Sequence, residues 1–427
     1  MVSRAAAAVL AALAACGITV PTARAAAEVV AARTLSPRLQ ELTLRTSALA
    51  APTRVRVLLP AGYAGSRRRY PVLYLLHGAV DDERAWTVKG DAERLTAGLG
   101  LIVVMPDSGP LDGYLDWYNA GRGGPPAWER YHIAELLPLI DRRLRTVSGR
   151  RGRAVAGLSM GGFGAMSYAA RHPDRFVAAA SFSGAVDTNN AGIGSVVGEA
   201  AYGPRRTQEV RWRAHNPWDL ARNLRGLDLV LRTGNGRPGG PLSGGDADGI
   251  EQVVHSASTS LHERLRTLGI DHLWEDHGPG EHTWPYWQRD LRRTLPRLMR
   301  ALRRPPAPPA GVTHRAVEPA YEVFGWRVRV RRPALEFSEL RGATRSGFTM
   351  HGSGTATVTT PRHHRPGARV RIVARSGGRV VRRAVVAAGP SGRLTVRIAL
   401  GPGNRRQQYA PGAVTRVHRV AVSLRPR

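Results

Sequence analysis

Between residues 54 and 231 the chain alternates short, almost wholly apolar runs with longer amphipathic stretches, and this alternation restricts the fold more than any other feature. Apolar runs bounded by Gly, Pro or Asp are typical of strands buried on both faces. The expected strands cover residues 54–59, 70–76, 101–105, the run through Val155, 176–182 and 227–231. The stretches at 128–143 and 163–170 predict helices. Such alternation predicts an α/β fold with a doubly wound, mostly parallel sheet.

The sequence Gly157-Leu158-Ser159-Met160-Gly161 lies in the middle of this alternation. It matches G-x-S-x-G, in which a serine sits on a tight turn from a strand to a helix. Small flanking residues let neighbouring backbones approach, and the helix points its amide end at a developing oxyanion. A chance match is the alternative in a chain with 48 glycines. The expected strand before the motif and helix after it favour Ser159 as a nucleophile.

A serine hydroxyl needs a base, and in this motif's fold the chain order is Ser, then Asp or Glu, then His. His282 is the best candidate, because it lies 123 residues after Ser159, just before the last expected helix. His272 and His277 are nearby competitors. His272 lies early in an expected strand, and His277 is followed by Gly-Pro. The interpretation is therefore that His282 is the base.

The orienting acid must follow the strand expected at 227–231, and three carboxylates qualify by position. They are Asp246, Asp248 and Glu251, and spacing alone does not choose among them. An oxyanion hole needs two backbone N–H groups. One is expected from Met160, after the nucleophile, and the other from the loop after an early strand, at Ala79.

Several short motifs occur in the order found in one known family. They are Leu75-Leu76-His77-Gly78, Val104-Met105-Pro106, Trp128-Glu129, Gly157 to Gly161, His172-Pro173, Ser183-Gly184, Gly234-Asn235-Gly236 and His282 to Trp287. Over roughly residues 35 to 300 the chain resembles the putative esterase family of α/β hydrolases. The resemblance is closest to the secreted trehalose mycolyltransferases (antigen 85-like esterases), and the family also includes formylglutathione hydrolases.

The resemblance implies a secreted serine esterase or acyltransferase that works without cofactor or metal on a small-molecule or glycolipid ester. It selects Glu251 as the acid, because the family's glutamate opens a helix shortly after the G-N-G loop. It also implies oxyanion amides at Ala79 and Met160. Substrate contacts are implied at Asp187 and Trp284.

One departure from the mycolyltransferases bears on the acceptor. Those enzymes carry an Asp-Gly pair and then an arginine near the sugar site, whereas Ala79 and Val80 follow His77-Gly78 here. The expected activity is therefore ester hydrolysis through an acyl-Ser159 intermediate. Transfer of an acyl group to a sugar hydroxyl is the alternative. A non-catalytic protein that binds the cell wall is the alternative from a different class.

The first 25 residues read as an export signal. A basic start at Arg4 precedes an apolar run from Ala5 to Val20, and Ala23-Arg24-Ala25 supplies a cleavage pattern. A lipoprotein signal at Cys16 is the alternative. Cys16 is the only cysteine, so removal of this segment excludes disulfides and thiolate metal sites. The protein is expected to be secreted or wall-associated, and no later segment is long and apolar enough to span a membrane.

The formal net charge is +31, and Lys89 is the only lysine. Arginine is scattered along the chain together with abundant Ala, Gly and Pro, which indicates a biased coding composition. Attraction to anionic polymers is then a side effect. No nucleic-acid-binding motif is present, so no nucleic-acid partner is expected.

The proline-rich stretch at 303–311 predicts a stiff spacer between two domains. Beyond it, short alternating strands at regular spacing predict a smaller, sandwich-like all-β domain. The expected organisation is a signal peptide at 1–25, a hydrolase domain at 26–302, the linker at 303–311 and a β-rich accessory domain at 312–427. Cell-wall polysaccharide is a candidate partner of the accessory domain.

Overall fold

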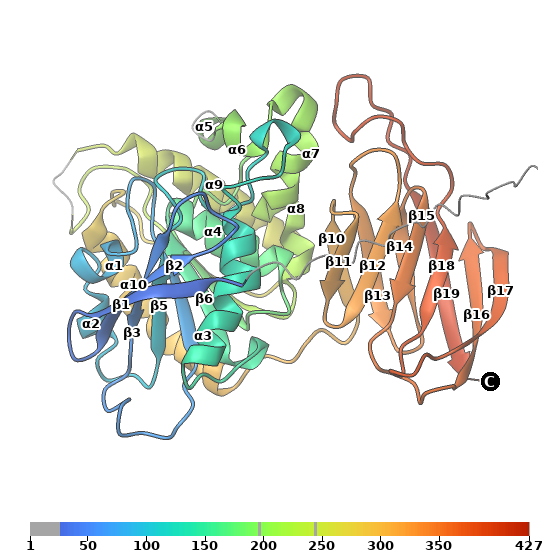
Figure 1. Ribbon diagram of the computed structural model, residues 1–427. Coiled ribbons are helices and arrows are strands. Elements are labelled where there is room, and N and C mark those ends of the chain that lie inside the picture. The colour runs from blue at the N-terminus through green and yellow to red at the C-terminus, as the bar shows by residue number, and fades with distance from the viewer. Residues whose placement is uncertain (1–25, 195–197, 243–245, 427) are drawn as a thin grey trace, which may run out of the picture.

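The computed structural model describes residues 26–194, 198–242 and 246–426 (Figure 1). The expected export signal at 1–25 lies outside these ranges. A nine-stranded sheet forms the centre of the first part of the chain, in the order β1-β2-β3-β5-β4-β6-β7-β8-β9. Its strands are Glu28–Thr34 (β1), Leu39–Arg45 (β2), Thr53–Leu58 (β3), Val72–Leu76 (β4), Ile102–Pro106 (β5), Arg153–Leu158 (β6), Ala178–Phe182 (β7), Asp228–Thr233 (β8) and Leu273–Asp276 (β9).

Strands β5, β4, β6, β7, β8 and β9 run parallel, whereas β1, β2 and β3 continue the sheet antiparallel at one edge. The central strands are buried on both faces, as their continuous apolar runs predicted. The α/β class with a mostly parallel sheet is therefore confirmed. Strand β1 was not expected, because it is largely exposed and has no continuous apolar run.

Helices cover both faces of the sheet. Helices α3, α4 and α9 bury apolar side chains in one core cluster, and α10 buries its apolar side in another. The longer helices are Leu137–Arg143 (α3), Met160–Arg171 (α4), Arg205–His215 (α7), Gly249–Thr267 (α9) and Trp284–Arg303 (α10). The short ones are Ala85–Val88 (α1), Ala92–Leu95 (α2), Ala191–Gly194 (α5), Glu199–Tyr202 (α6), Pro217–Leu220 (α8), Asn119–Gly121 (η1), Arg130–Leu136 (η2), Arg150–Gly152 (η3) and Ala221–Leu224 (η4).

The helix expected over 128–143 is interrupted in its hydrogen bonding. Its residues 130–136 (η2) form a π-helix, and regular α-helix resumes at Leu137. The wider turn places His132 so that its Nδ1 lies 2.8 Å from the Tyr168 hydroxyl on α4. Apolar periodicity does not distinguish the two helix types, because both place one face against the sheet.

After α10 the chain forms two antiparallel sheets that share an apolar core, beside the part that holds the nine-stranded sheet (Figure 1). The six-stranded sheet has the order β10-β13-β14-β19-β16-β17, and the four-stranded sheet has the order β11-β12-β15-β18. The strands are Val312–Ala316 (β10), Ala320–Val323 (β11), Trp326–Arg331 (β12), Ser338–Thr344 (β13), Gly347–Gly352 (β14), Thr355–Thr359 (β15), Arg369–Ser376 (β16), Arg379–Ala387 (β17), Thr395–Ala399 (β18) and His418–Pro426 (β19).

Most of these strands alternate buried and exposed residues, for example in β12 and β18, so each sheet has one face in the core and one in solvent. This agrees with the sandwich-like arrangement expected from the sequence. Within the described ranges, each helix is either too short or too polar to cross a bilayer.

Candidate active site

Ser159 occupies the turn between strand β6 and helix α4. Its φ of 52° lies in the left-handed region, where a non-glycine residue stores about 1–3 kcal/mol of strain. Two glycines make the turn possible. A Cβ on Gly157 would lie 2.2 Å from the Gly161 carbonyl oxygen, and one on Gly161 would lie 2.4 Å from the His77 carbonyl oxygen. The turn therefore has the strained strand-to-helix form that the motif predicts.

Three of the predicted side chains form one chain of hydrogen bonds. His282 lies in the loop before α10, and its Nε2 is 2.9 Å from Ser159 Oγ. Its Nδ1 is 2.7 Å from Glu251 Oε2. The order hydroxyl, imidazole, carboxylate and these distances are those required of a nucleophile, a base and a group that orients the base.

The Glu251 carboxylate is completely buried, and protein donors surround it. Its Oε1 accepts hydrogen bonds from the Ser183 hydroxyl (2.8 Å), the Thr233 hydroxyl (3.0 Å) and the Gly234 N–H (2.7 Å). Oε2 is left to His282. These donors come from the ends of β7 and β8, so the sheet itself fixes where the carboxylate lies.

Asp248, one of the two competing carboxylates, has a different place. It caps helix α9, accepting from the Ile250 N–H (2.9 Å) and the Glu251 N–H (3.0 Å), and its other oxygen accepts from the His282 N–H (2.7 Å). Burial by itself would raise the pKa of Asp248, but these backbone hydrogen bonds outweigh it and lower the pKa. Asp246 is exposed. Asp248 therefore holds the backbone around the imidazole rather than its ring.

The competing histidines lie elsewhere. His272 Nε2 is 2.7 Å from His262 Nδ1, and its Nδ1 is 2.8 Å from the Ile270 carbonyl oxygen. The His277 ring stacks on Tyr286 at 5.3 Å. Burial, with a smaller effect of Arg289, lowers the pKa of His277 to about 4.

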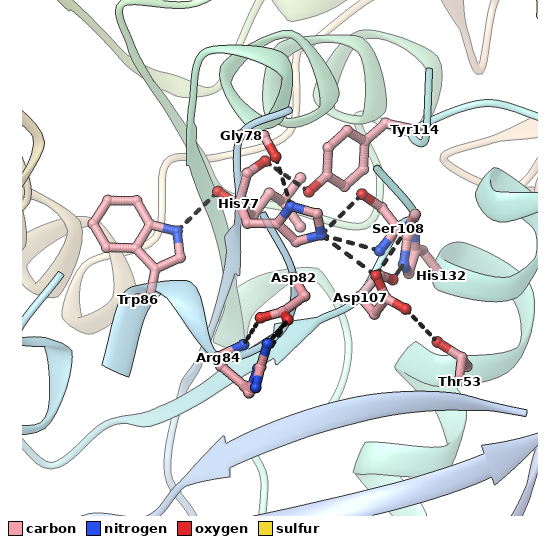
Figure 2. A network of polar contacts seen from close by, with 12 residues as sticks. Thr53, His77, Gly78, Asp82, Arg84, Trp86, Asp107, Ser108, Tyr114 and His132 are labelled. Atoms are coloured by element: carbon pink, nitrogen blue, oxygen red, sulfur yellow. Dashed lines mark hydrogen bonds and ion pairs between the residues drawn. The ribbon is translucent and has the colours of Figure 1, made fainter. Parts of the chain in front are cut away.

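The loop after β4 carries Ala79, and hydrogen bonds hold the three successive backbone carbonyl groups before Ala79 (Figure 2). Trp86 Nε1 donates to the Leu76 carbonyl (2.9 Å), and the Tyr114 hydroxyl donates to the His77 carbonyl (3.0 Å). The Gly78 carbonyl oxygen lies 2.7 Å from His77 Nδ1. Three consecutive peptide groups are thus held before Ala79.

The hydrogen bonds of His77 define its tautomer. The Ser108 backbone N–H is a donor and lies 3.1 Å from His77 Nε2, so Nε2 accepts and Nδ1 carries the proton. Nδ1 therefore donates to the Gly78 carbonyl. In a planar trans peptide the C=O and the following N–H point in opposite directions. The His77 ring accordingly fixes the direction of the Ala79 N–H.

A cavity of about 330 Å³ opens at Ser159, and the predicted oxyanion residues Ala79 and Met160 both line it. Met160 is the first residue of α4, where backbone N–H groups have no partner within the helix. Most of the wall is apolar, formed by Leu111, Met160, Phe163, Ile193, Ile250, Val253 and Val254. Asp112 is the only carboxyl group among the described lining residues. The arrangement suits an apolar acyl chain beside the serine hydroxyl.

Asp187 is not among the residues that line this cavity. It is buried, and its Oδ1 accepts from Asn216 Nδ2 (3.0 Å) and the Asn189 N–H (3.1 Å). Its Oδ2 accepts from the Ser260 hydroxyl (2.7 Å). The structure therefore places Asp187 in a buried polar network and not in the cavity lining.

Trp284 also lies outside the lining residues. It packs edge-on against Trp86 (5.2 Å between ring centroids) and Trp287 (5.3 Å), and the Lys89 ammonium lies 5.9 Å from its ring. Among the described residues, no group of three or more His, Cys, Asp or Glu side chains is arranged to hold a metal ion.

Several supporting residues were missed by the sequence analysis: the donors Ser183 and Thr233, the cap Asp248 and the ring of His77. Ser183 and His77 stood in the motifs that carried the resemblance, but without a role. Both residues directly follow a central strand, Ser183 after β7 and His77 after β4. Their position at the carboxyl end of a strand is the signal that could have found them.

Comparisons with known proteins show which proteins this chain is similar to. Residues 46–298, more than half of the chain, match a family model described as "Putative esterase". Esterase Rv1288 of Mycobacterium tuberculosis is 37% identical over 266 residues, which are 58% of this chain and 56% of that protein. The chain thus spans just over half the length of this relative. The diacylglycerol acyltransferase/mycolyltransferase Ag85B of Mycolicibacterium smegmatis is 31% identical over 273 residues, covering 58% of this chain and 81% of that protein.

Solved structures share the fold. An S-formylglutathione hydrolase from Agrobacterium tumefaciens has a TM-score of 0.54 at 20% identity, covering 64% of this chain and 99% of its own. MPT51 (FbpC1) of Mycobacterium tuberculosis has a TM-score of 0.50 at 24% identity, covering 61% and 97%. The chain therefore belongs to the esterase family of α/β-hydrolase-fold enzymes.

Proposed function

We propose that the chain is a secreted serine carboxylic-ester hydrolase that works through an acyl-Ser159 intermediate. The observation that carries the proposal is the hydrogen-bonded series of Ser159, His282 and Glu251 at the mouth of an apolar cavity. A non-catalytic wall-binding protein would not need a buried carboxylate held by three donors behind an imidazole.

In the first half of the reaction, Ser159 Oγ attacks the ester carbonyl carbon while His282 Nε2 takes the hydroxyl proton. The carbonyl oxygen becomes an oxyanion, which the backbone N–H groups of Ala79 and Met160 stabilise. The bond from carbon to the alcohol oxygen then breaks, and His282 gives its proton to that oxygen. The products of this half are the free alcohol and acyl-Ser159.

In the second half, His282 removes a proton from water, and the resulting hydroxide attacks the acyl carbon. The bond to Ser159 Oγ breaks, Oγ takes the proton back from His282, and the carboxylic acid leaves. Glu251 keeps Nδ1 of His282 protonated and stabilises the imidazolium in both halves. The acyl chain occupies the apolar cavity.

The test is the Ser159→Ala variant of the mature protein, assayed on p-nitrophenyl esters of increasing chain length. Because the acyl-enzyme cannot form, turnover should fall by about 10⁴-fold or more with an unchanged circular dichroism spectrum. A fluorophosphonate probe should label the unchanged protein and not the variant. Near-normal turnover by a folded variant would overturn the proposal.

Acyl transfer to a sugar hydroxyl is the second candidate, favoured by the similarity to Ag85B. A transferase must bind the sugar and keep water from the acyl-enzyme. Val80 lies in the loop after β4 and is 82% exposed. Its side chain offers no hydrogen-bond donor to a sugar. Hydrolysis should therefore dominate. The measurement is the ratio of free acid to acyl-sugar at saturating trehalose, and mostly acyl-trehalose would reverse the order of the two candidates.

Export and domain organisation complete the proposal. Cleavage after Ala25 would release a mature protein that begins just before strand β1. The hydrolase domain would end at 302 and the accessory domain would begin at 312, on either side of a proline-rich linker. Mass spectrometry of the protein from culture medium gives the processed N-terminus and separates this cleavage from lipid attachment at Cys16.

A further inference from the structure

The last part of the chain has a charge imbalance that the rest does not share. Residues 340–427 contain 18 arginines and no Asp, Glu or Lys, so all 32 acidic residues precede them. A biased coding composition explains why arginine replaces lysine throughout, since Lys89 is the only lysine. It does not explain why Asp and Glu disappear from the last 88 residues alone. The absence of acids therefore needs a structural or functional reason.

Five of these arginines line one open cleft of about 640 Å³ on the outer face of the six-stranded sheet. We call this surface the arginine face; it comprises Arg341, Arg371, Arg375, Arg383 and Arg425. They come from four strands, β13, β16, β17 and β19, that lie within one sheet (Figure 1). The remaining lining residues include hydroxyl groups of Thr344, Ser346, Thr349 and Ser423.

The strand register places the charges close together. Arg371 lies directly opposite Arg425 on the neighbouring strand. The next row on the same face contains Arg383 on β17, Val373 on β16 and Ser423 on β19. Val373 is paired with both of the others. Side chains opposite each other on neighbouring antiparallel strands have Cβ atoms about 4.5–5.5 Å apart, and like charges there destabilise the sheet.

Among the described residues, only Arg341 of the arginine face has a carboxylate partner. Arg341 has both carboxylate oxygens of Glu339 within 3.1 Å. Arg371, Arg383 and Arg425 have no carboxylate partner among the described residues, and all three are exposed. A bound anion would supply the missing negative charge.

The four-stranded sheet provides a comparison within the same domain. Its outer face also carries arginines, but Arg329 lies opposite Thr357 and Arg331 opposite Thr355. Arg397 also lies opposite Thr357, from the other side. Here arginines alternate with neutral threonines, so no two are directly opposed. High arginine content alone therefore does not produce the arrangement of the arginine face.

We propose that the arginine face binds an anionic glycan, a polysaccharide that carries phosphate or carboxylate groups. Guanidinium groups bind both anions through paired N–H donors, and the neighbouring hydroxyl groups suit the hydroxyls of a sugar. A nucleic acid fits less well, because the only aromatic side chain lining the cleft, Phe348, is 4% exposed and offers no surface for base stacking. The binding site is separate from the cavity at Ser159.

The test compares two triple variants of the full chain that remove the same charge. One is Arg371→Thr, Arg383→Thr and Arg425→Thr; the control is Arg329→Thr, Arg331→Thr and Arg397→Thr. Threonine keeps the preference for strand. Binding to poly(glycerol phosphate), polygalacturonate, neutral dextran and a single-stranded DNA oligonucleotide is measured by calorimetry across a salt series. The two anionic glycans distinguish phosphate from carboxylate as the recognised group.

The expected result is salt-dependent binding to one or both anionic glycans, none to dextran, and a loss of at least tenfold in the first variant against less than threefold in the control. Turnover of a soluble ester should stay unchanged in both variants, and an unchanged circular dichroism spectrum reports that the substituted sheets are folded. An equal loss in the two variants would mean that net charge alone attracts the polymer. Tighter binding to DNA than to both glycans, or absence of binding to any of them, would also overturn the proposal.

Discussion

At the scale of single residues, two carboxylates near His282 perform different tasks. Glu251 is aimed at the imidazole Nδ1, whereas Asp248 holds the His282 backbone and caps the helix that carries Glu251. Both are one hydrogen bond from the same histidine, yet only one can set the tautomer of the ring. Substituting each by its amide separates these tasks, because the amide keeps the size of the side chain.

We expect Glu251→Gln to lower kcat by about 10³–10⁴-fold, because the amide cannot stabilise the imidazolium and can favour the wrong tautomer. Asp248→Asn should lower kcat by less than about tenfold and cost about 1 kcal/mol of stability through a weaker cap. Ester turnover and thermal unfolding of both variants check this. A dead Asp248 variant beside an active Glu251 variant would show that the acid has been misassigned.

Asp112 is the only carboxyl group among the described residues that line the cavity. Burial raises the pKa of Asp112 to about 6, although the Gly198 N–H, 2.9 Å from Oδ2, opposes the rise. An acyl chain that fills the cavity removes further water from this carboxyl and disfavours its ionised form. Binding of an apolar chain should therefore take up a proton.

The affinity of the Ser159→Ala variant for an octanoyl ester should consequently rise about three- to tenfold as pH falls from 7.5 to 5.5, within the limit of tenfold per pH unit for one proton. In the additional variant Asp112→Asn this dependence should disappear. Asparagine tolerates the positive φ of 50° at this position. Calorimetric titration at several pH values measures both, and an unchanged slope in Asp112→Asn would assign the dependence to another group.

At the scale of elements, the loop after β4 is held by its own His77 ring and by side chains from two other segments. Trp86, Tyr114 and the His77 ring each bind one of three successive carbonyl groups. Such anchoring costs no reorganisation during the reaction, which is the property that makes oxyanion stabilisation effective. Because His77 would act through the Ala79 N–H, the proposed oxyanion donor, it is assigned as a positioning residue.

We expect His77→Leu to lower kcat about 10- to 100-fold with little change in KM, less than the 10²–10³-fold loss from deleting an oxyanion donor outright. Affinity for a trifluoromethyl ketone, which forms a tetrahedral adduct, should fall in parallel. The matched control is Tyr168→Phe, which removes a buried hydrogen bond to His132 without touching the loop. A rise in KM with unchanged kcat would assign His77 to substrate binding instead.

The sequence was sufficient to predict the elements whose apolar runs are continuous. The central strands and the elbow at Ser159 follow from burial on both faces and from the glycine spacing. Strand β1 could not be predicted, because a mostly exposed edge strand carries little apolar signal. The π-helical turn at 130–136 was equally hidden, since apolar periodicity does not distinguish a π-helix from an α-helix.

The candidate site was predictable to a different degree at each position. Chain order favoured His282, but the choice among Asp246, Asp248 and Glu251 depends on how the loop between β8 and α9 folds, and only the resemblance favoured Glu251. Asp187 and Trp284 were assigned by resemblance alone, and neither lines the cavity. Local sequence carries no information on whether such a residue lines the cavity.

At the scale of the whole molecule, the β region and the hydrolase part share a partly buried ionic contact. Arg171, at the end of α4, is 2.7 Å from Glu129 and 2.6 Å from Glu318, which follows strand β10. The Asn223 side chain pairs with the Arg315 backbone in both directions nearby, at 2.9 and 2.8 Å. The two parts are therefore in direct contact, although a proline-rich spacer joins them.

Burial by itself would raise the pKa of Glu318, but the Arg171 guanidinium outweighs it and holds the pKa below 4.5. A carboxyl group whose folded pKa is lowered stabilises the fold above its unfolded pKa, and this contribution is lost as pH falls through the folded value. The Glu318 carboxylate is 35% exposed, so solvent screens part of the interaction.

We therefore expect Glu318→Gln to lower the free energy of unfolding by about 1–2 kcal/mol at pH 7, or roughly 2–4 °C in Tm. The difference in unfolding free energy between the variant and the unchanged protein should shrink below about pH 4.5. There Glu318 becomes protonated and is then neutral, like the glutamine of the variant. The matched control is Glu322→Gln, which breaks an exposed pair with Arg327 within the β region and should cost under about 0.5 kcal/mol. Equal effects of the two variants, or a difference that does not depend on pH, would mean that the contact with Arg171 does not couple the two parts of the molecule.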